Sequence, residues 1–453
     1  MNTRRICYDI LLKIEKEDMY VSELLEAALR TLQFSDKRDR AFITRIVEGV
    51  TERKISLDFL IDRFSKKGKA SGIKTEIRIV LRMGIYQIRY MDSVPDRAAV
   101  SEAVRLTKEL GYEGLNGYVN GLLRSVADMK EQEKLDSFLV SRMDTRYSTP
   151  QWLCDFLVEE YGKESARLIL EDQYEEHDTV IRINSLKTNK EELRKKLMEA
   201  GIEVSDGVLS DRCLRIKGYD SIRRIPGYRD GLFIVQDETS VCAVENIGIK
   251  PGDKVLDLCA SPGGKTLLAY ELACIIDKAS GEQKDGFVLS RDISESKLSR
   301  IKENAERLDF KGIQLEVSDA TQLDKGIAGL PDDEKFDVVI ADVPCSGLGI
   351  IGRKNDIKYH MNPESMKVLS EQGLLILHNA SRYVKRGGHI CFSTCTINPA
   401  ENGDNVRRFL EDLDASMQDG SIKGNMFEII KEKTYLQGID GSDGFYYCIL
   451  EAM

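Results

Sequence analysis

Two cysteines in this 453-residue chain stand just after apolar runs that read as buried strands. Cys345 lies three residues beyond FDVVIAD (336–342), and Cys395 directly follows GGHICFST (387–394). A cysteine thiolate is a strong nucleophile where its surroundings favour ionisation. If both strands end at one edge of a sheet, the two thiols could act on the same substrate.

Methylation at carbon 5 of cytosine is one reaction that fits such a pair. A thiolate that adds to carbon 6 turns the ring into an enamine, whose carbon 5 can attack an electrophilic methyl group. The carbon 5 proton must then leave before the thiol is eliminated, and a second group nearby can assist. Asp342 could hydrogen-bond the nitrogen edge of the ring and make the addition easier.

Four aspartates stand where successive apolar runs end: Asp257, Asp292, Asp319 and Asp342. Aspartate is also a common turn and cap residue, so these positions could serve structure alone. A doubly wound sheet, however, brings consecutive strand ends together, and an acid at the end of its second strand holds a ribose hydroxyl pair. Asp292 occupies that place, which predicts an adenosyl pocket beside the cysteines.

The stretch CASPGGKT (259–266) suggests an anion-binding turn that opens a helix. Its GGKT ending resembles a phosphate-binding loop, and FDVVIAD resembles the strand that holds magnesium beside one. That loop requires G-x-x-x-x-G-K-[ST], and Cys259 replaces the first glycine. A nucleotide-hydrolysing protein is therefore the second candidate. The two glycines still allow backbone amides to approach a carboxylate.

The elements that must position these residues alternate between strand and helix after about residue 236. Runs at 254–261, 286–292, 313–319, 336–342 and 387–396 are strand-like, and most are continuously apolar, as in parallel sheets buried on both faces. The last two runs, FEIIKE and GFYYCILEAM, have no helix between them and predict an antiparallel edge hairpin. Asn398 and Glu401 match a capping box, and Pro399 suits the first helical position. The fold class is α/β, a doubly wound sheet with its site at the carboxyl edge.

Three domains are expected. Residues 1–130 carry helical stripes such as Ile6, Ile10 and Ile14 and predict an all-helical domain. Residues 131–235 predict a charged connector and a small α/β subdomain, with a strand at TVIRINSLKTN and a helix at KEELRKKLMEAG. Residues 236–453 form the doubly wound domain.

Composition indicates an ordinary globular protein of the cytosol. No early apolar run resembles a signal peptide, and no uncharged stretch could span a bilayer. The ten cysteines would stay reduced there, and four histidines without a CxxC pair make a zinc site improbable. Net charge is −10, but residues 1–130 carry 24 Lys and Arg against 19 Asp and Glu. Basic clusters at 66–74 and 215–229 permit RNA binding, although such clusters are often only solvated surface.

Five motifs together resemble those of the RNA cytosine-5 methyltransferases that use S-adenosylmethionine: DLCASPGGKT, DISESKL, SDAT, DVPCSG and STCTINPAEN. The stretch VPDRAAVSEAVRLTKELGYEGLNGYVNGLLRSV is similar to the closing helices of the NusB domain, an RNA-binding fold. The combination is similar to bacterial methyltransferases of small-subunit (16S) ribosomal RNA. The resemblance implies a class I, Rossmann-like methyltransferase domain, a NusB-like domain, and an RNA-binding role for the small α/β subdomain.

The resemblance also implies roles for individual residues. Cys395 is the expected nucleophile, Cys345 is expected to assist product release, and Asp342 is expected to sit between cofactor and target base. Asp292 should take the ribose hydroxyls and Asp319 should lie beside the adenine. The methionine part of S-adenosylmethionine should be held by the loop residues Cys259, Ala260, Ser261, Pro262, Gly263, Gly264 and Lys265. The segments YSTPQW (147–152) and RINSLK (182–187) resemble the RNA-facing region of the family.

Two further hypotheses stay open beside a cytosine-5 methyltransferase of small-subunit ribosomal RNA. Related enzymes with the same chemistry act on transfer RNA, so a transfer-RNA substrate is the nearer one. A non-catalytic NusB-like RNA-binding factor is the other, and the complete motif set argues against it. The expected protein is a monomer with no metal and no membrane partner.

Overall fold

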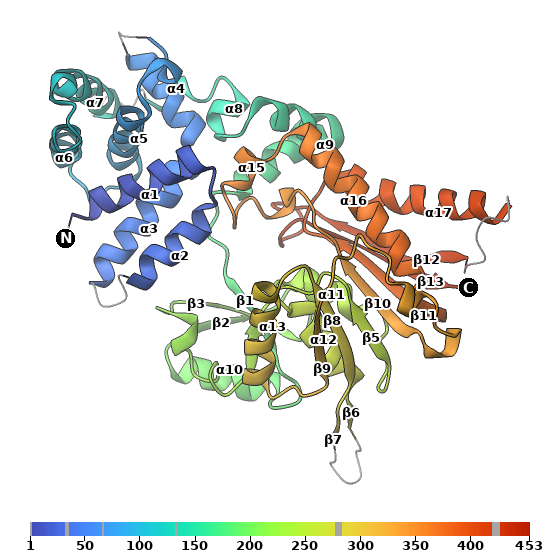
Figure 1. Ribbon diagram of the computed structural model, residues 1–453. Helices are drawn as coiled ribbons and strands as arrows, with labels where there is room; N and C mark the ends of the chain where they lie inside the picture. The colour runs from blue at the N-terminus through green and yellow to red at the C-terminus, as the bar shows by residue number, and fades with distance from the viewer. Residues whose placement is uncertain (1, 32–35, 66–67, 132–134, 277–282, 419–425) are drawn as a thin grey trace. The chain divides into compact units, whose positions relative to one another are not determined.

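The computed structural model describes residues 2–31, 36–65, 68–131, 135–276, 283–418 and 426–453. They form two compact units, coloured along the chain in Figure 1. One comprises Met1–Gln173 with Ile351–His360, and the other Tyr174–Ile350 with Met361–Met453. The domain boundaries expected at residues 130 and 235 stay predictions. Lys66 and Lys67 of the first basic cluster lie outside the described residues.

The first unit is built from helices, and the structure describes no strand in it. Its central element is α5 (Thr75–Tyr90), where every residue from Ile79 to Ile88 is buried. An amphipathic helix buries one stripe, whereas α5 is covered on all sides, as expected for a central helix. The other helices of eight or more residues are α1 (Thr3–Glu17), α2 (Val21–Thr31), α3 (Lys37–Glu52), α4 (Lys54–Phe64), α6 (Asp96–Glu109), α7 (Asn116–Glu131) and α9 (Gln151–Asp172).

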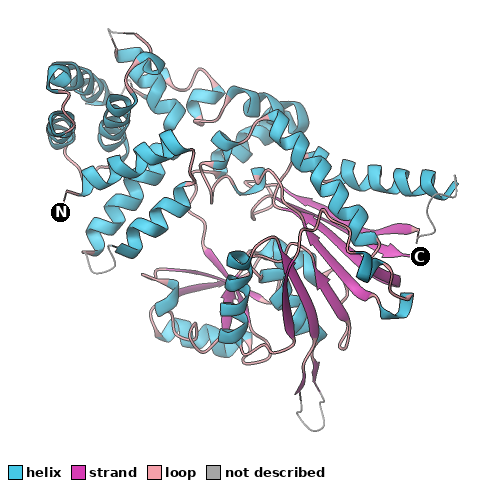
Figure 2. Cartoon of the chain, viewed as in Figure 1, coloured by secondary structure: helices cyan, strands magenta, loops and turns pink. Residues whose placement is uncertain are grey.

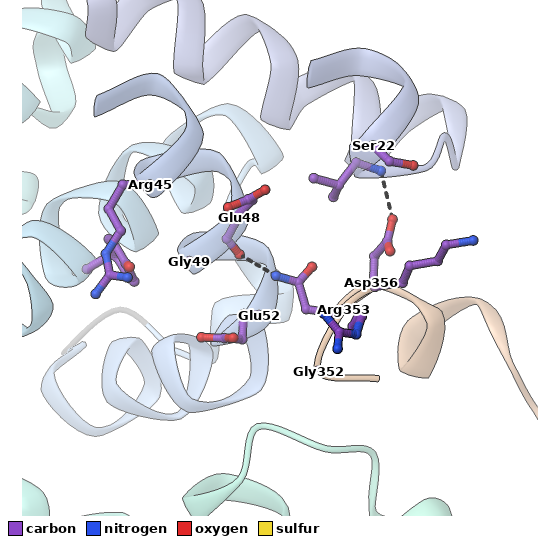
Figure 3. A pocket seen from close by; sticks show the side chains of 12 residues that line it. Ser22, Arg45, Glu48, Gly49, Glu52, Gly352, Arg353 and Asp356 are labelled. Carbon is purple, nitrogen blue, oxygen red and sulfur yellow. Dashed lines mark hydrogen bonds between the residues drawn. The ribbon is translucent and has the colours of Figure 1, made fainter. Parts of the chain in front are cut away.

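A segment far away in sequence, Ile351–His360, completes this unit. Figure 3 shows it beside α2 and α3, where it lines a polar pocket. The backbone N–H of Val21 donates to Asp356 Oδ2 at 2.7 Å, and Asn355 Nδ2 donates to the Glu48 carbonyl at 3.3 Å. Nothing in the local sequence predicts this packing.

The small α/β part of the second unit is a four-stranded sheet in the order β2-β3-β1-β4. All its described pairs are antiparallel. Strand β1 (Thr179–Ile183) and helix α10 (Lys190–Glu199) confirm the strand and helix predicted there. The remaining strands are β2 (Glu203–Asp206), β3 (Cys213–Lys217) and β4 (Phe233–Val235).

The sheet that positions the cysteines has seven strands in the order β12-β13-β11-β10-β5-β8-β9, labelled in Figure 1 and drawn in magenta in Figure 2. The five strands from β11 to β9 pair in parallel, and β13 pairs antiparallel with both β11 and β12. The predicted doubly wound sheet with an antiparallel edge hairpin is confirmed. The strands are β5 (Lys254–Asp257), β8 (Phe287–Asp292), β9 (Ile313–Val317), β10 (Phe336–Asp342), β11 (Val384–Thr394), β12 (Phe427–Tyr435) and β13 (Phe445–Ala452).

Helices cover both faces of this sheet, which explains its continuously apolar strands. In β10, Val338 and Ile340 belong to one core cluster, and Val339 and Ala341 belong to another. The first cluster includes residues of α11 (Glu238–Glu245), α12 (Gly264–Ala273) and α13 (Glu295–Leu308), and the second those of α16 (Pro363–Ser381) and α17 (Gly403–Gln418). Among the described helices, none has the length and apolar character needed to cross a membrane.

Candidate active site

The strand order reverses direction at β5, which lies between β8 and β10. In doubly wound sheets such a switch point opens a crevice at the carboxyl ends of the strands. Asp257, Asp292 and Asp342 are the last residues of β5, β8 and β10, and Asp319 lies two residues beyond β9. The structure therefore places all four predicted aspartates along this edge.

The loop from Cys259 to Lys265 crosses the edge and leads into α12. Gly263 has φ +107°, a left-handed conformation that favours glycine, and it immediately precedes the helix. A Cβ on Gly264 would lie 3.2 Å from Gln236 Nε2, so a glycine lets that side chain pack against the backbone. The result is a helix N-terminus with bare backbone at the switch point, where an anionic group is favoured.

Asp292 ties this loop to the end of β8. Its Oδ2 accepts from the Ser261 N–H at 2.9 Å, its Oδ1 accepts from the Ile293 N–H at 2.8 Å, and Lys297 Nζ lies 3.1 Å away. Ile293 is 60% exposed beside it. Asp319 is exposed and accepts from the N–H and hydroxyl of Thr321, so part of its role is to close a turn.

Asp257 is the most deeply buried of the four aspartates. Its Oδ2 accepts from the Thr266 hydroxyl at 2.7 Å, while its Oδ1 has no hydrogen-bond partner in the described part of the chain. Burial raises the pKa of Asp257 to about 7, and the neighbouring Asp342 adds to the rise. A buried acceptor without a donor is unusual and marks a place where a ligand's donor would fit.

Asp257→Asn is expected to change how stability depends on pH. Because the folded-state pKa of Asp257 lies above its unfolded value, the folded protein holds a proton that the unfolded chain loses between about pH 4 and 7. Wild-type stability should fall across this window by roughly 2–4 kcal/mol from this group alone. The variant lacks the penalty and keeps an oxygen for Thr266.

Urea unfolding of both proteins at pH 5 and pH 8 measures this difference. The variant should gain stability relative to wild type as pH rises. A constant difference would show that Asp257 ionises normally in the folded protein.

Lys265 and Asp342 form an ion pair across the crevice. Lys265 Nζ donates to Asp342 Oδ2 at 2.7 Å, and Ser393 Oγ donates to Asp342 Oδ1 at 2.8 Å. The lysine is 8% exposed and its ammonium lies 5.0 Å from the centre of the Phe445 ring. Burial lowers the pKa of Lys265, whereas the Asp342 carboxylate raises it. The net result is a pKa above the usual value for lysine. The lysine of GGKT is thus used within the site.

The two cysteines that the sequence singles out face each other. Cys345 Sγ lies 3.3 Å from Cys395 Sγ, and both side chains are partly exposed. The contact with Cys395, followed by burial, raises the pKa of Cys345 well above its usual value. Two thiols this close titrate as a coupled pair, in which the first ionisation leaves one thiol beside one thiolate.

The remaining cysteines behave as small apolar residues, as predicted. Seven are buried: Cys7, Cys154, Cys213, Cys242, Cys274, Cys391 and Cys448. Cys259 is partly exposed, and burial followed by the carboxylate of Asp257 raises its pKa well above the usual value. It therefore lines the loop as an inert thiol.

The predicted capping box after Cys395 is wrong. Asn398 does cap the short 3-10 helix Pro399–Glu401, with Pro399 in its first turn. The Glu401 carboxylate, however, accepts from the Ser346 N–H at 2.7 Å instead of the Asn398 backbone. The spacing of Asn398 and Glu401 is local, whereas Ser346 is 55 residues away, so the sequence pattern could not reveal this partner.

The expectation that YSTPQW and RINSLK face RNA is wrong for three of their side chains, whereas Ser185 and Lys187 of RINSLK are exposed. Ser148 and Thr149 are fully buried, and Ser148 Oγ accepts from the Ile55 N–H at the start of α4. Arg182 is 1% exposed and pairs with Glu271 of α12, which is buried with it. These side chains hold elements together and cannot contact a nucleic acid.

Comparisons with known proteins cover nearly the whole chain. The family model described as 16S rRNA methyltransferase RsmB/F matches residues 245–451. The NusB family model matches residues 1–128, and a ferredoxin-like domain model of RsmF/B-like methyltransferases matches residues 149–223.

Relatives align from end to end. The chain is 32% identical to the "Probable ribosomal RNA small subunit methyltransferase B" of Bacillus subtilis (strain 168), over 99% of this chain and 98% of the relative. It is 29% identical to the ribosomal RNA small subunit methyltransferase B of Vibrio cholerae, over 99% of this chain and 97% of the relative.

Solved structures share the fold. PH0851 matches with a TM-score of 0.76 and 23% identity, over 99% of this chain and 98% of that one. NSun6 from Pyrococcus horikoshii, solved with SFG, matches with a TM-score of 0.55 and 17% identity, over 67% of this chain and 98% of that one.

Proposed function

We propose, from the premise that the chain belongs to the RsmB/F family of 16S rRNA methyltransferases, that it methylates carbon 5 of a cytosine in that RNA through a covalent bond to Cys395. S-adenosylmethionine is the methyl donor of this family. The observation that carries the proposal is the pair of partly exposed sulfurs, 3.3 Å apart, at the carboxyl edge of the sheet.

The residues at the switch point fit S-adenosylmethionine. The free Oδ1 of Asp257 offers an acceptor for its ammonium group, and the N-terminus of α12 suits its carboxylate. Asp292 lies where ribose hydroxyls are held, and the exposed Ile293 offers an apolar surface for a base, with Asp319 beyond it. When bound, the cofactor supplies an electrophilic methyl group.

The side chains around the thiols can prepare the ring for attack. A thiolate at Cys395 adds to carbon 6 of the cytosine, forming the Sγ–C6 bond and moving electron density to carbon 5. The Cys345 thiol can donate a hydrogen bond to that thiolate beforehand. The Asp342 carboxylate, fixed by Lys265 and Ser393, can accept from the amino edge of the ring and orient it.

Release of the methylated RNA requires loss of the carbon 5 proton and cleavage of the Sγ–C6 bond. A bound S-adenosylmethionine would supply the methyl group that carbon 5 takes up. Cys345 first releases its own proton to solvent and, as a thiolate, takes the carbon 5 proton; the electrons of that C–H bond form the C5=C6 double bond, and the Sγ–C6 bond breaks to regenerate the Cys395 thiolate. Cys345 Sγ is within reach of this step because it lies beside the attacking sulfur.

The target cytosine must leave any base stack before it reaches the thiols, so unpaired or flipped RNA is the substrate. The small α/β part offers phosphate contacts. Arg223 and Arg229 are exposed, and neither forms an ion pair with any described residue. Arg215 and Arg224 of the same basic cluster are neutralised by Glu238 and Asp220.

Bisulfite mapping of ribosomal and transfer RNA, from cells with and without this gene, tests the proposed function. One cytosine of 16S rRNA should resist conversion only when the gene is present. Methylation that disappears from a transfer RNA instead would favour the transfer-RNA alternative. A methylation-dependent mass shift on 16S rRNA that bisulfite does not detect would contradict carbon 5 as the site.

A further inference from the structure

The loops that carry the two thiols come from different strands and are joined by a buried carboxylate. Glu401 is 2% exposed. Its Oε2 accepts from the Ser346 N–H at 2.7 Å, and its Oε1 accepts from the Ser346 hydroxyl at 2.6 Å. Asn398 Nδ2 donates to the same Oε1 at 2.8 Å. One side chain therefore binds the residue after Cys345 and a residue three positions after Cys395.

Three hydrogen-bond donors converge on the side chain of residue 401, so this position requires acceptors only. A carboxylate accepts hydrogen bonds at both oxygens. A glutamine amide has only one oxygen, and its NH₂ group would face one of the donors from Ser346 or Asn398. Burial raises the pKa of Glu401, and the hydrogen bonds from Ser346 and Asn398 act in the opposite direction. A neutral substitute would leave at least one buried donor without an acceptor, which is costly.

A second set of hydrogen bonds, made by Asn402, holds the turn that contains Cys395. Asn402 Nδ2 donates to the Thr396 carbonyl at 2.9 Å, and the Thr394 hydroxyl donates to Asn402 Oδ1 at 2.5 Å. Thr396 Oγ1 lies 2.7 Å from Ser346 Oγ. The residues flanking both thiols are thus fixed, while the thiols themselves stay partly exposed.

We propose that Glu401 is a positioning residue that sets the distance between Cys345 and Cys395. The part concerning catalysis rests on the proposed function. Ser346 is the point of action, because its N–H and hydroxyl are the only groups bonded to Glu401 from the Cys345 loop among the described contacts. The Glu401 charge also contributes, after Cys395 and burial, to the raised pKa of Cys345.

Glu401→Gln tests the inference because it keeps side-chain length but loses the second acceptor and the charge. Glu411→Gln, an exposed glutamate on the following helix, is the matched control. Without RNA or cofactor, diamide oxidises neighbouring thiols to a disulfide, and mass spectrometry of the peptides quantifies the Cys345–Cys395 bond. We expect the Glu401→Gln rate to fall at least about tenfold, and the control to match wild type. An unchanged or higher rate would overturn the inference.

The second readout is the covalent protein–RNA adduct. Glu401→Gln should accumulate it as Cys345→Ala does, because Cys395 can still add while Cys345 is displaced. If Cys345→Ala accumulates adduct but Glu401→Gln turns over normally, the positioning role is wrong. If disulfide formation slows while neither variant forms adduct, the proposed covalent function fails and the positioning role stands.

Ser346→Ala provides the same test should Glu401→Gln not fold. It removes one of the three donors and leaves the carboxylate in place, so the disulfide rate should fall by a smaller factor than in Glu401→Gln. A wild-type rate in a folded Ser346→Ala protein would count against the inference. Thermal unfolding of each variant separates this effect from general destabilisation.

Discussion

Cys395→Ala is expected to abolish methyl transfer from S-adenosylmethionine to 16S rRNA, with a rate loss on the order of 10³ or more. The reason is chemical: carbon 5 of cytosine becomes nucleophilic only after a thiolate has added to carbon 6. Cys345 lies beside the missing sulfur but is expected to act in product release, not in the attack. Transfer of a radiolabelled methyl group to RNA measures the loss.

Folding and binding controls make this result specific. Cys395→Ser keeps the size of the side chain and should be nearly as inactive, since a hydroxyl is a far weaker nucleophile at neutral pH. Cys242→Ala, a buried cysteine on α11, should keep most of the activity. Full activity in Cys395→Ala would mean that the nucleophile is another group.

Cys345→Ala is expected to trap the enzyme on its substrate. By the proposed mechanism, Cys395 can still form the Sγ–C6 bond and carbon 5 can still accept the methyl group, but the group proposed to remove the carbon 5 proton is missing. The adduct should appear as a band of reduced mobility on a denaturing gel, and most of the enzyme should enter it when RNA and cofactor are in excess.

The double variant Cys345→Ala with Cys395→Ala is the control, and it should give no band because the attacking sulfur is gone. Absence of the band from Cys345→Ala itself, with cofactor and substrate present, would remove the release role from Cys345. Normal turnover by that variant would lead to the same conclusion.

Much of the fold could be predicted because its signals are local. The central strands β5, β10 and β13 are short apolar runs, and such a run indicates burial on both faces. The position of Asp257, Asp292 and Asp342 follows from this pattern, because residues at the carboxyl ends of parallel strands meet at one edge. The cysteine pair was predicted for the same reason.

Hydrogen-bond and ion-pair partners that are distant in sequence could not be predicted. Asn398 and Glu401 match a capping box, yet Glu401 accepts a hydrogen bond from Ser346, which lies in the loop after a neighbouring strand. Arg182 belongs to a motif that resembles an RNA-facing segment, yet its charge is buried against Glu271. In both cases the local pattern fits two structures, and a long-range hydrogen bond or ion pair decides between them.

By itself, the sequence determined which residue types gather at the edge of the sheet, since alternation of strands and helices leaves few topologies. Only the tertiary structure decided how they act on one another. It brings two sulfurs to 3.3 Å from each other, it raises the pKa of Asp257 to about 7 by burial, and it packs Ile351–His360 with the helical unit. The physical reason is that distance and burial, which set hydrogen bonds and pKa values, depend on segments that the chain brings together only when it folds.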